Sequence, residues 1–129
     1  MAHSSPLWFD PTLCLIGGTW RPSSAGETLP LVNPSTGAEI CQIARGTAAD
    51  IDAAVAAAQT AQEGDWGRMS ATERGRILTR LGQVIADNVA TLAALEVMDV
   101  GKPLTQARAD AVALARYCEF YGGAADKVM

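Results

Sequence analysis

The sequence predicts an incomplete α/β arrangement in which four short strands come first and three helices follow. Short apolar runs bounded by turn residues fill the segment before residue 47, as is typical of strands. After that point apolar residues recur at helical spacing. Strands and helices do not alternate a second time, so the parallel sheet of a layered α/β domain is predicted to be missing from this chain.

Turn residues define the predicted strands. Gly17-Gly18 supplies the positive φ that a tight hairpin needs, and Asn33-Pro34 with Gly37 forms a second turn, because the residue before a proline avoids the helical region. The predicted strands are residues 13–16, 19–21, 28–32 and 40–43. We expect the first two to pair as a hairpin and the last to return from the Asn-Pro turn.

Capping signals define the predicted helices. Thr47 with Asp50 and Ser70 with Glu73 both have the spacing of a capping box, and Gly101 before a proline is a helix stop signal. The predicted helices run from Thr47 to Gly64, from Ser70 to Gly101 with a break at Asp87-Asn88, and from about Thr105 to Tyr121. The stripes of large apolar residues on the second helix are wide enough to need a covering layer.

Composition excludes several classes of partner. The net charge of −4 argues against nucleic acid and anionic membranes, which both bind clustered Lys and Arg. Neither a secretory signal nor an apolar run of about 18 residues is present, so no membrane association is expected. Cys14, Cys41 and Cys118 are too widely spaced for a disulfide framework or a zinc site, which favours a cytoplasmic protein. Residues 1–12, with the lone His3, are expected to be disordered.

Asp99 is the one charged residue at an unfavourable position. It lies in the last turn of the second predicted helix, at the negative end of the helix dipole. Either Lys102, three residues on, compensates it, or a bound hard cation does. The glycine pairs lack the spacing of a phosphate loop, and no histidine is placed to activate a cysteine, so we predict neither a catalytic nor a cofactor-binding residue.

Six stretches in order together resemble the N-terminal segment of the NAD(P)-dependent aldehyde dehydrogenase family. They are Ile16–Trp20, Val32–Gly37, Ala49–Ala58, Trp66–Leu78, Leu95–Pro103 and Tyr117–Lys127. The resemblance implies that residues 13–129 are the incomplete beginning of a dinucleotide-binding domain. It also implies that the intact enzyme oxidises a small-molecule aldehyde to a carboxylic acid with NAD or NADP, as a homodimer or homotetramer.

The family's chemistry uses a cysteine thiolate that attacks the aldehyde to form a thiohemiacetal. Hydride then leaves for the nicotinamide, and a glutamate helps water to cleave the resulting thioester, while an asparagine side chain and a backbone amide stabilise the oxyanion. The family's cysteine follows Gly-Gln-X, and none of the three cysteines here does. The family's Glu-Leu-Gly-Gly and Pro-Trp-Asn stretches are also absent from this chain. The resemblance therefore implies that the catalytic residues are not in this chain.

Two positions carry over from the family's structural cation site. The resemblance assigns the carbonyl of Val32 and the carboxylate of Asp99 as ligands for Na⁺, K⁺ or Mg²⁺. The family's third helix also lines the mouth of the substrate tunnel, and the matching face here, near Ala109, Ala113 and Tyr117, consists mostly of small residues. A piece of a dehydrogenase is the favoured interpretation, and a catalytically silent binding module that reuses the segment is the alternative.

Overall fold

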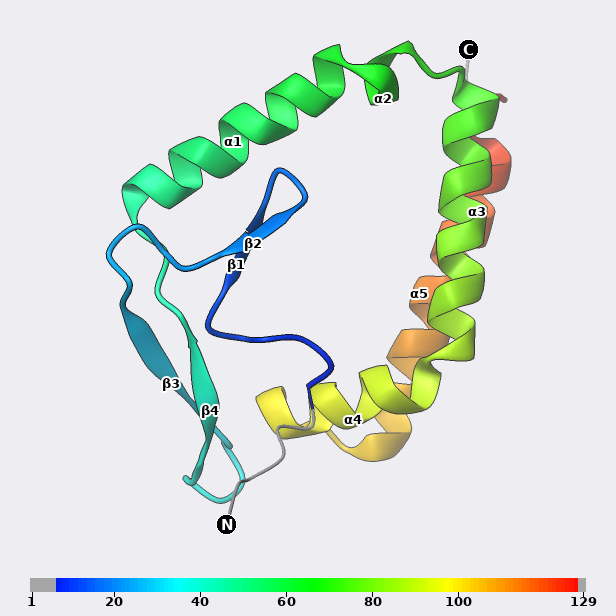
Figure 1. Cartoon of the computed structure of the whole chain (residues 1–129). Helices are drawn as coiled ribbons and strands as arrows, with labels where there is room; N and C mark the ends of the chain where they lie inside the picture. The colour runs from blue at the N-terminus through cyan, green and yellow to red at the C-terminus, as the bar shows by residue number, and fades with distance from the viewer. Residues whose placement is uncertain (1–6, 128–129) are drawn as a thin grey trace. The chain divides into compact units, whose positions relative to one another are not determined.

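A computed structural model describes residues 7–127 of the chain. The chain divides into two compact units, unit 1 with residues 1–64 and unit 2 with residues 65–129. Figure 1 shows the elements in chain order, strands and α1 in unit 1 and the remaining helices in unit 2.

Unit 1 begins with the predicted hairpin. Strands β1 (Cys14–Ile16) and β2 (Thr19–Arg21) pair antiparallel, with Leu15 opposite Trp20. Gly17 and Gly18 have φ values of 60° and 77°. This left-handed conformation at both turn positions is that of the tight turns that match the twist of a hairpin, which confirms the prediction.

A second antiparallel pair joins β3 (Thr28–Val32) to β4 (Glu39–Ala44) in a separate sheet. Pro30 is tolerated because each strand of a two-stranded sheet has a free edge. The turn between the strands is held by Asn33, whose side chain accepts a hydrogen bond from the Ser35 amide at 2.9 Å. Only antiparallel pairs occur among the described residues, as the predicted absence of a parallel sheet requires.

Helix α1 (Ala48–Glu63) starts at the predicted capping box. Thr47 and Asp50 each accept from the other's backbone amide, and the helix ends at Gly64. The Asp50 carboxylate also accepts from the amide of Ser24 at 3.0 Å, and only 5% of the residue is exposed. Asp50 therefore joins the loop after β2 to the first turn of α1.

Unit 2 consists of α2 (Asp65–Arg68), α3 (Ala71–Asp87), α4 (Val89–Val100) and α5 (Leu104–Ala124). The predicted break at Asn88 separates α3 from α4 with a bend of 74°. The Asn88 side chain donates to the carbonyl of Val84 at 2.8 Å and so satisfies a carbonyl at the end of α3. The single turn of α2 was not predicted, and Arg74 on α3 stabilises its end by donating to the Met69 carbonyl.

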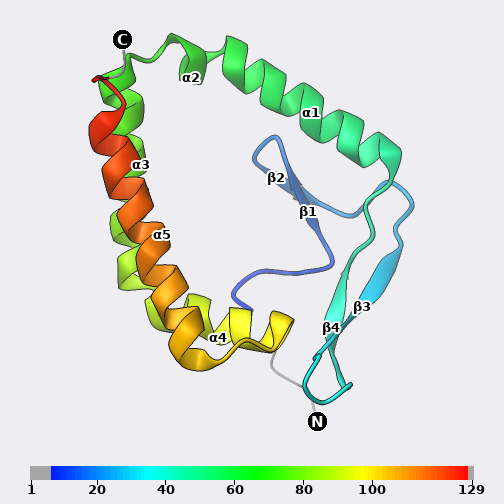
Figure 2. The ribbon, with the colours of Figure 1, turned by 180° about the vertical axis from the view of Figure 1, so that it is seen from behind.

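Helices α3 and α5 run side by side, as both Figure 1 and Figure 2 show. Gly75, Gly82 and Gly122 lie between them. A Cβ on Gly82 would stand 2.9 Å from the carbonyl oxygen of Ala115 and 3.1 Å from the Cβ of Cys118. The two helix backbones therefore approach more closely than side chains at these positions would allow.

The core of unit 2 is small and rich in alanine. The buried residues of α5 lie on one face, at Ala107, Ala111, Ala115 and Cys118, and the last two form a cluster with Ile85 of α3. No large side chain of the described residues is fully buried. The apolar stripe of α3, defined by Ile77, Leu81 and Val84, is exposed by 40–53%.

The N-terminal stretch expected to be disordered falls partly outside the described residues, which begin at Leu7. Residues 7–12 have defined contacts. Asp10 accepts from the amide and hydroxyl of Thr12, and the Phe9 ring stacks on Trp20. Within residues 7–127 no single helix is long and apolar enough to cross a bilayer, and α3 with α4 meets that test only as a pair joined across their bend.

Candidate functional site

The two predicted cation ligands lie at the ends of two elements. Val32 is the last residue of β3 in unit 1, and Asp99 lies in the last turn of α4 in unit 2. They belong to different compact units, so a cation held by both residues stays a prediction.

Asp99 is exposed and has no hydrogen-bond or ion-pair partner within residues 7–127. Helix α4 has no basic residue in its last turn, and Gly101 ends it with a φ of 69° while its amide donates to the carbonyl of Val97. The carboxylate therefore stands beside the free carbonyls at the negative end of the helix dipole. This arrangement leaves its charge available to a cation.

Lys102, the alternative partner for Asp99, forms ion pairs with two other carboxylates. Its ammonium donates to the carboxylate of Glu96 and, at 2.5 Å, to that of Asp110. The hydrogen bonds with Asp110 and Glu96 raise the pKa of Lys102, and the hydrogen bonds from Lys102 and Gln106 lower the pKa of Asp110. The ion pair between Lys102 and Asp99 is thus not formed, because the ammonium is paired with Glu96 of α4 and Asp110 of α5.

At the other end, the sheet register is interrupted between Leu31 and Val32, so the ladder is irregular where Val32 leads into the turn. Val32 is 45% exposed. Carbonyl and carboxylate oxygens together suit a hard cation such as Na⁺, K⁺ or Mg²⁺. No cluster of three His, Cys, Asp or Glu side chains occurs among residues 7–127, so any cation here would depend on backbone oxygens.

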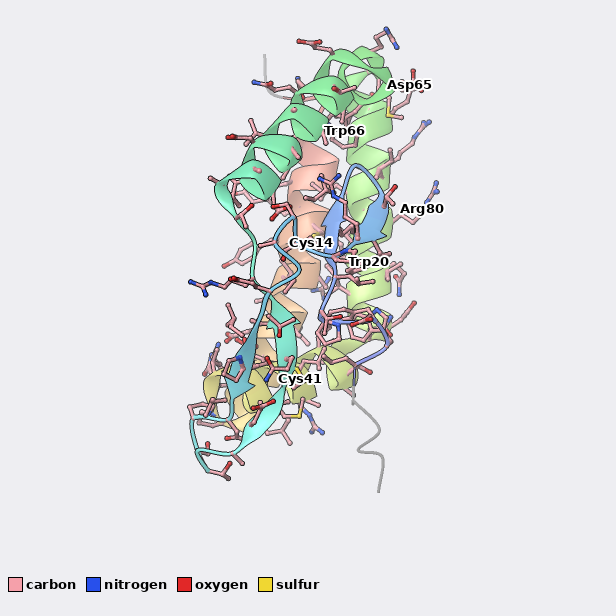
Figure 3. The ribbon with its side chains drawn as sticks, turned by 60° about the vertical axis from the view of Figure 1, so that its left-hand side comes forward. Cys14, Trp20, Cys41, Asp65, Trp66 and Arg80 are labelled. Carbon is pink, nitrogen blue, oxygen red and sulfur yellow. The ribbon has the colours of Figure 1, made fainter. Side chains whose placement is uncertain are left out.

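The three cysteines lie on three different elements. Cys14 and Cys41 are half-buried on β1 and β4, where Figure 3 labels them. Cys118 is buried in the core between α3 and α5. Its place between the two helices agrees with the prediction that it is a packing residue rather than a nucleophile.

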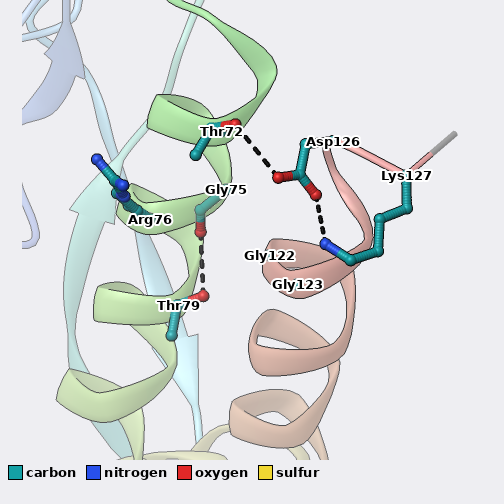
Figure 4. A pocket seen from close by; sticks show the side chains of 8 residues that line it. All are labelled: Thr72, Gly75, Arg76, Thr79, Gly122, Gly123, Asp126 and Lys127. Atoms are coloured by element: carbon teal, nitrogen blue, oxygen red, sulfur yellow. Dashed lines mark hydrogen bonds and ion pairs between the residues drawn. The ribbon is translucent and has the colours of Figure 1, made fainter.

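A pocket that the sequence did not predict opens between α3 and the end of α5 (Figure 4). It has a volume of about 290 Å³ and is lined by Thr72, Gly75, Arg76, Thr79, Gly122, Gly123, Asp126 and Lys127. Asp126 accepts from Thr72 at 3.2 Å and from Lys127 at 2.6 Å, and the Thr79 hydroxyl donates to the Gly75 carbonyl. These polar groups satisfy one another, and the pocket contains no paired nucleophile and base.

Comparison with known proteins shows to which family a chain with these elements belongs. The sequence profile of the aldehyde dehydrogenase family matches residues 20–129. The chain belongs to the aldehyde dehydrogenase family. The hydroxyisobutyraldehyde dehydrogenase of Mycolicibacterium austroafricanum is 42% identical over 119 residues, which cover 92% of this chain and 23% of that protein. The mitochondrial aldehyde dehydrogenase of Rattus norvegicus is 43% identical over 115 residues, which cover 87% of this chain and 22% of the rat protein.

Solved structures of aldehyde dehydrogenases have the same fold over this segment. A Burkholderia cenocepacia protein assigned to the aldehyde dehydrogenases superposes with a TM-score of 0.86 at 57% identity, over 88% of this chain and 24% of that one. The NAD-dependent aldehyde dehydrogenase from Sinorhizobium meliloti superposes with a TM-score of 0.85 at 31% identity, over 91% and 24%. The chain therefore spans about a quarter of the length of the relatives it matches.

The α5 face singled out by the family resemblance lies away from the buried face. Ala109 and Tyr117 are exposed and Ala113 is half-buried, whereas the packed residues of α5 are on the other side of the helix. Glycines with positive φ serve turns and a helix end, and Gly75, Gly82 and Gly122 serve helix packing. That no glycine of this chain binds the cofactor stays a prediction.

Proposed function

We propose that this chain is the N-terminal part of a longer NAD(P)-dependent aldehyde dehydrogenase that oxidises small-molecule aldehydes to carboxylic acids. The observation that carries the proposal is the match of nearly the whole chain to about a quarter of the length of such enzymes, at 42–57% identity. The relatives include a crystal structure in complex with nicotinamide adenine dinucleotide. The intact protein would act in the cytoplasm as a homodimer or homotetramer.

In this proposal the chain contributes structure and not chemistry. No nucleophile–base pair exists within residues 7–127, and Cys118, its most buried thiol, lies in a helix core that a reacting aldehyde cannot enter. The described glycines offer no cradle for a pyrophosphate, so the dinucleotide would be held by residues outside this chain. We therefore expect the 129-residue chain alone to be inactive.

The experiment compares two proteins in one assay. The 129-residue chain and the product of the whole reading frame are each given a panel of aldehydes with NAD⁺ or NADP⁺, and reduction of the nicotinamide is followed by absorbance. We expect reduction with the longer product only. The matched control is Cys118→Ser in both proteins, which should leave activity in place.

Two results would contradict the proposal. A reading frame that stops after Met129, with no downstream Gly-Gln-X-Cys or Pro-Trp-Asn stretch, would favour a stand-alone binding module. Reduction of the nicotinamide by the 129-residue chain, abolished by Cys118→Ser, would instead place catalysis within this segment.

The cation forms a second part of the proposal. Asp99 is an exposed acid with no partner among the described residues, and the lysine that could neutralise it pairs with Glu96 and Asp110. We infer that in the intact protein Na⁺, K⁺ or Mg²⁺ is bound by the Asp99 carboxylate and the Val32 carbonyl. The role of the ion would be to stabilise the fold, because both ligands lie where an element ends, Val32 at the end of β3 and Asp99 in the last turn of α4.

A further inference from the structure

Unit 1 contains an open pocket beside the β1–β2 hairpin that the proposed dehydrogenase activity does not explain. Its volume is about 380 Å³, and the described residues that line it are Trp8, Phe9, Asp10, Leu13 and Trp20. Three of these five side chains are aromatic, although aromatic residues make up only 5% of the chain. The pocket therefore combines aromatic ring surfaces with the carboxylate of Asp10.

The three rings support one another. Phe9 stacks on Trp20 with ring centroids 5.8 Å apart and an interplanar angle of 19°. Trp8 meets Phe9 edge to face at 5.3 Å and 74°. Trp8 and Trp20 are 66% and 47% exposed, so their ring surfaces are accessible from solvent. The negative faces of aromatic rings attract cations.

The carboxylate of Asp10 adds a full negative charge beside the rings. Its Oδ1 accepts from the Thr12 hydroxyl at 2.6 Å and from the Thr12 amide at 2.9 Å, and these hydrogen bonds lower the pKa of Asp10. No hydrogen bond to its Oδ2 and no ion pair with Lys or Arg occurs within the described part of the chain. Arg21 follows Trp20 on β2, and alternation along a strand directs it to the opposite face.

We propose that this pocket binds an alkylated ammonium cation, above all a quaternary one, against the rings of Trp8, Phe9 and Trp20 that line it together with Asp10. A quaternary ammonium ion presents methyl groups to the apolar walls and spreads its charge over them, so it loses little hydration on entry. A primary ammonium would give up hydrogen bonds to water that a single carboxylate cannot replace. The proposal is one of binding only and is independent of the aldehyde chemistry.

The test is an NMR titration of the 129-residue chain, because the chain has three tryptophans whose indole N–H signals report separately. Tetramethylammonium chloride is compared with sodium chloride at equal ionic strength and with neopentyl alcohol, an uncharged molecule of nearly the same shape. We expect saturable shifts of the Trp8 and Trp20 signals. Trp66, which belongs to unit 2 and does not line the pocket, should stay unchanged.

The charge dependence distinguishes a cation site from an apolar patch. Neopentyl alcohol should bind about five-fold more weakly than tetramethylammonium, and Asp10→Asn should weaken tetramethylammonium binding by about the same factor. The matched control is Asp65→Asn in unit 2, at a side chain that is 93% exposed, which should leave the affinity unchanged.

Equal affinity for the charged and uncharged ligands, or shifts that do not saturate, would overturn the proposal. So would an Asp10→Asn variant that binds tetramethylammonium as well as the parent chain. If that substitution disturbs the residues before the hairpin, the comparison of the two ligands on the unmodified chain decides the question alone.

Discussion

The close approach of α3 and α5 predicts that neighbouring glycines respond oppositely to the same substitution. Gly122 and Gly123 are consecutive residues near the end of α5. A Cβ on Gly122 would lie 2.7 Å from the Gly75 carbonyl oxygen and 3.0 Å from the Thr79 amide nitrogen. A Cβ on Gly123 would meet nothing within 4 Å. Only the first substitution therefore forces the helices apart.

The magnitude follows from two opposing effects. Replacing glycine by alanine in a helix favours folding by about 0.5–1 kcal/mol, somewhat less near a helix end. At Gly122 the Cβ would also meet the Thr79 hydroxyl, which can rotate away, but the Gly75 carbonyl oxygen and the Thr79 amide nitrogen are backbone atoms and cannot. Overpacking of this kind costs about 1–3 kcal/mol. Gly122→Ala should therefore destabilise unit 2 by about 1–2 kcal/mol, whereas Gly123→Ala should be neutral or stabilising.

The assay is thermal and urea unfolding of both variants followed by far-UV circular dichroism. For a unit of this size a change of 1 kcal/mol moves Tm by about 4–8 °C, so the two variants should differ by about 10 °C. Gly75→Ala provides a second test, because its Cβ would meet the Gly122 carbonyl oxygen from the other helix. The double variant Gly75→Ala with Gly122→Ala should lose less stability than the sum, since the helices need to separate only once. Equal gains in Tm at Gly122 and Gly123 would refute the close approach of the two backbones.

Three further predictions follow. Hydrogen bonds from the Thr47 and Ser24 amides lower the pKa of Asp50 from 3.8 to about 2, so its stabilising effect should be complete above pH 3.8 and be lost as the pH falls toward 2. Asp50→Asn should remove this acid dependence of the unfolding midpoint. The control Asp52→Asn, at an exposed position of α1, should keep it. Identical pH profiles of the parent and both variants would contradict the prediction. In the intact protein, Asp99→Asn should abolish any rise of Tm that Na⁺, K⁺ or Mg²⁺ produces. In cation-free buffer the variant should be as stable as the parent, or up to about 1 kcal/mol more stable, because a negative charge at the end of the helix has been removed. A Tm that responds neither to the substitution nor to the identity of the salt would exclude the cation. Finally, eleven large apolar side chains of residues 65–127, including the apolar stripe of α3, are at least 40% exposed. Because burying each of them further would stabilise the protein by about 1 kcal/mol, the isolated chain should enhance ANS fluorescence and self-associate in sedimentation experiments. A monomer that does not bind ANS would show a self-sufficient domain.

Local signals in the sequence determined the secondary structure. The hairpin at Gly17-Gly18, the capping boxes at Thr47 and Ser70 and the stop at Gly101 were all predicted correctly, because each depends on the backbone preferences of a few consecutive residues. The family resemblance, carried by short stretches in order, also led to a membership that comparison confirmed.

Contacts between residues distant in sequence were decided by the tertiary structure. The sequence indicated Lys102, three residues away, as a possible ion-pair partner of Asp99. The fold instead brings Asp110 of α5 to the Lys102 ammonium, and Asp99 has no partner among the described residues. Nothing in the pattern around Gly75 indicated that it faces Gly122, because helix pairing depends on which faces meet across a loop. The ring cluster beside Asp10 was likewise not predictable from the sequence, because Phe9 meets Trp20 only once the hairpin has formed. Periodicity and capping act along the chain, whereas ion-pair choice, helix approach and pocket formation depend on distances through space that only the folded backbone sets.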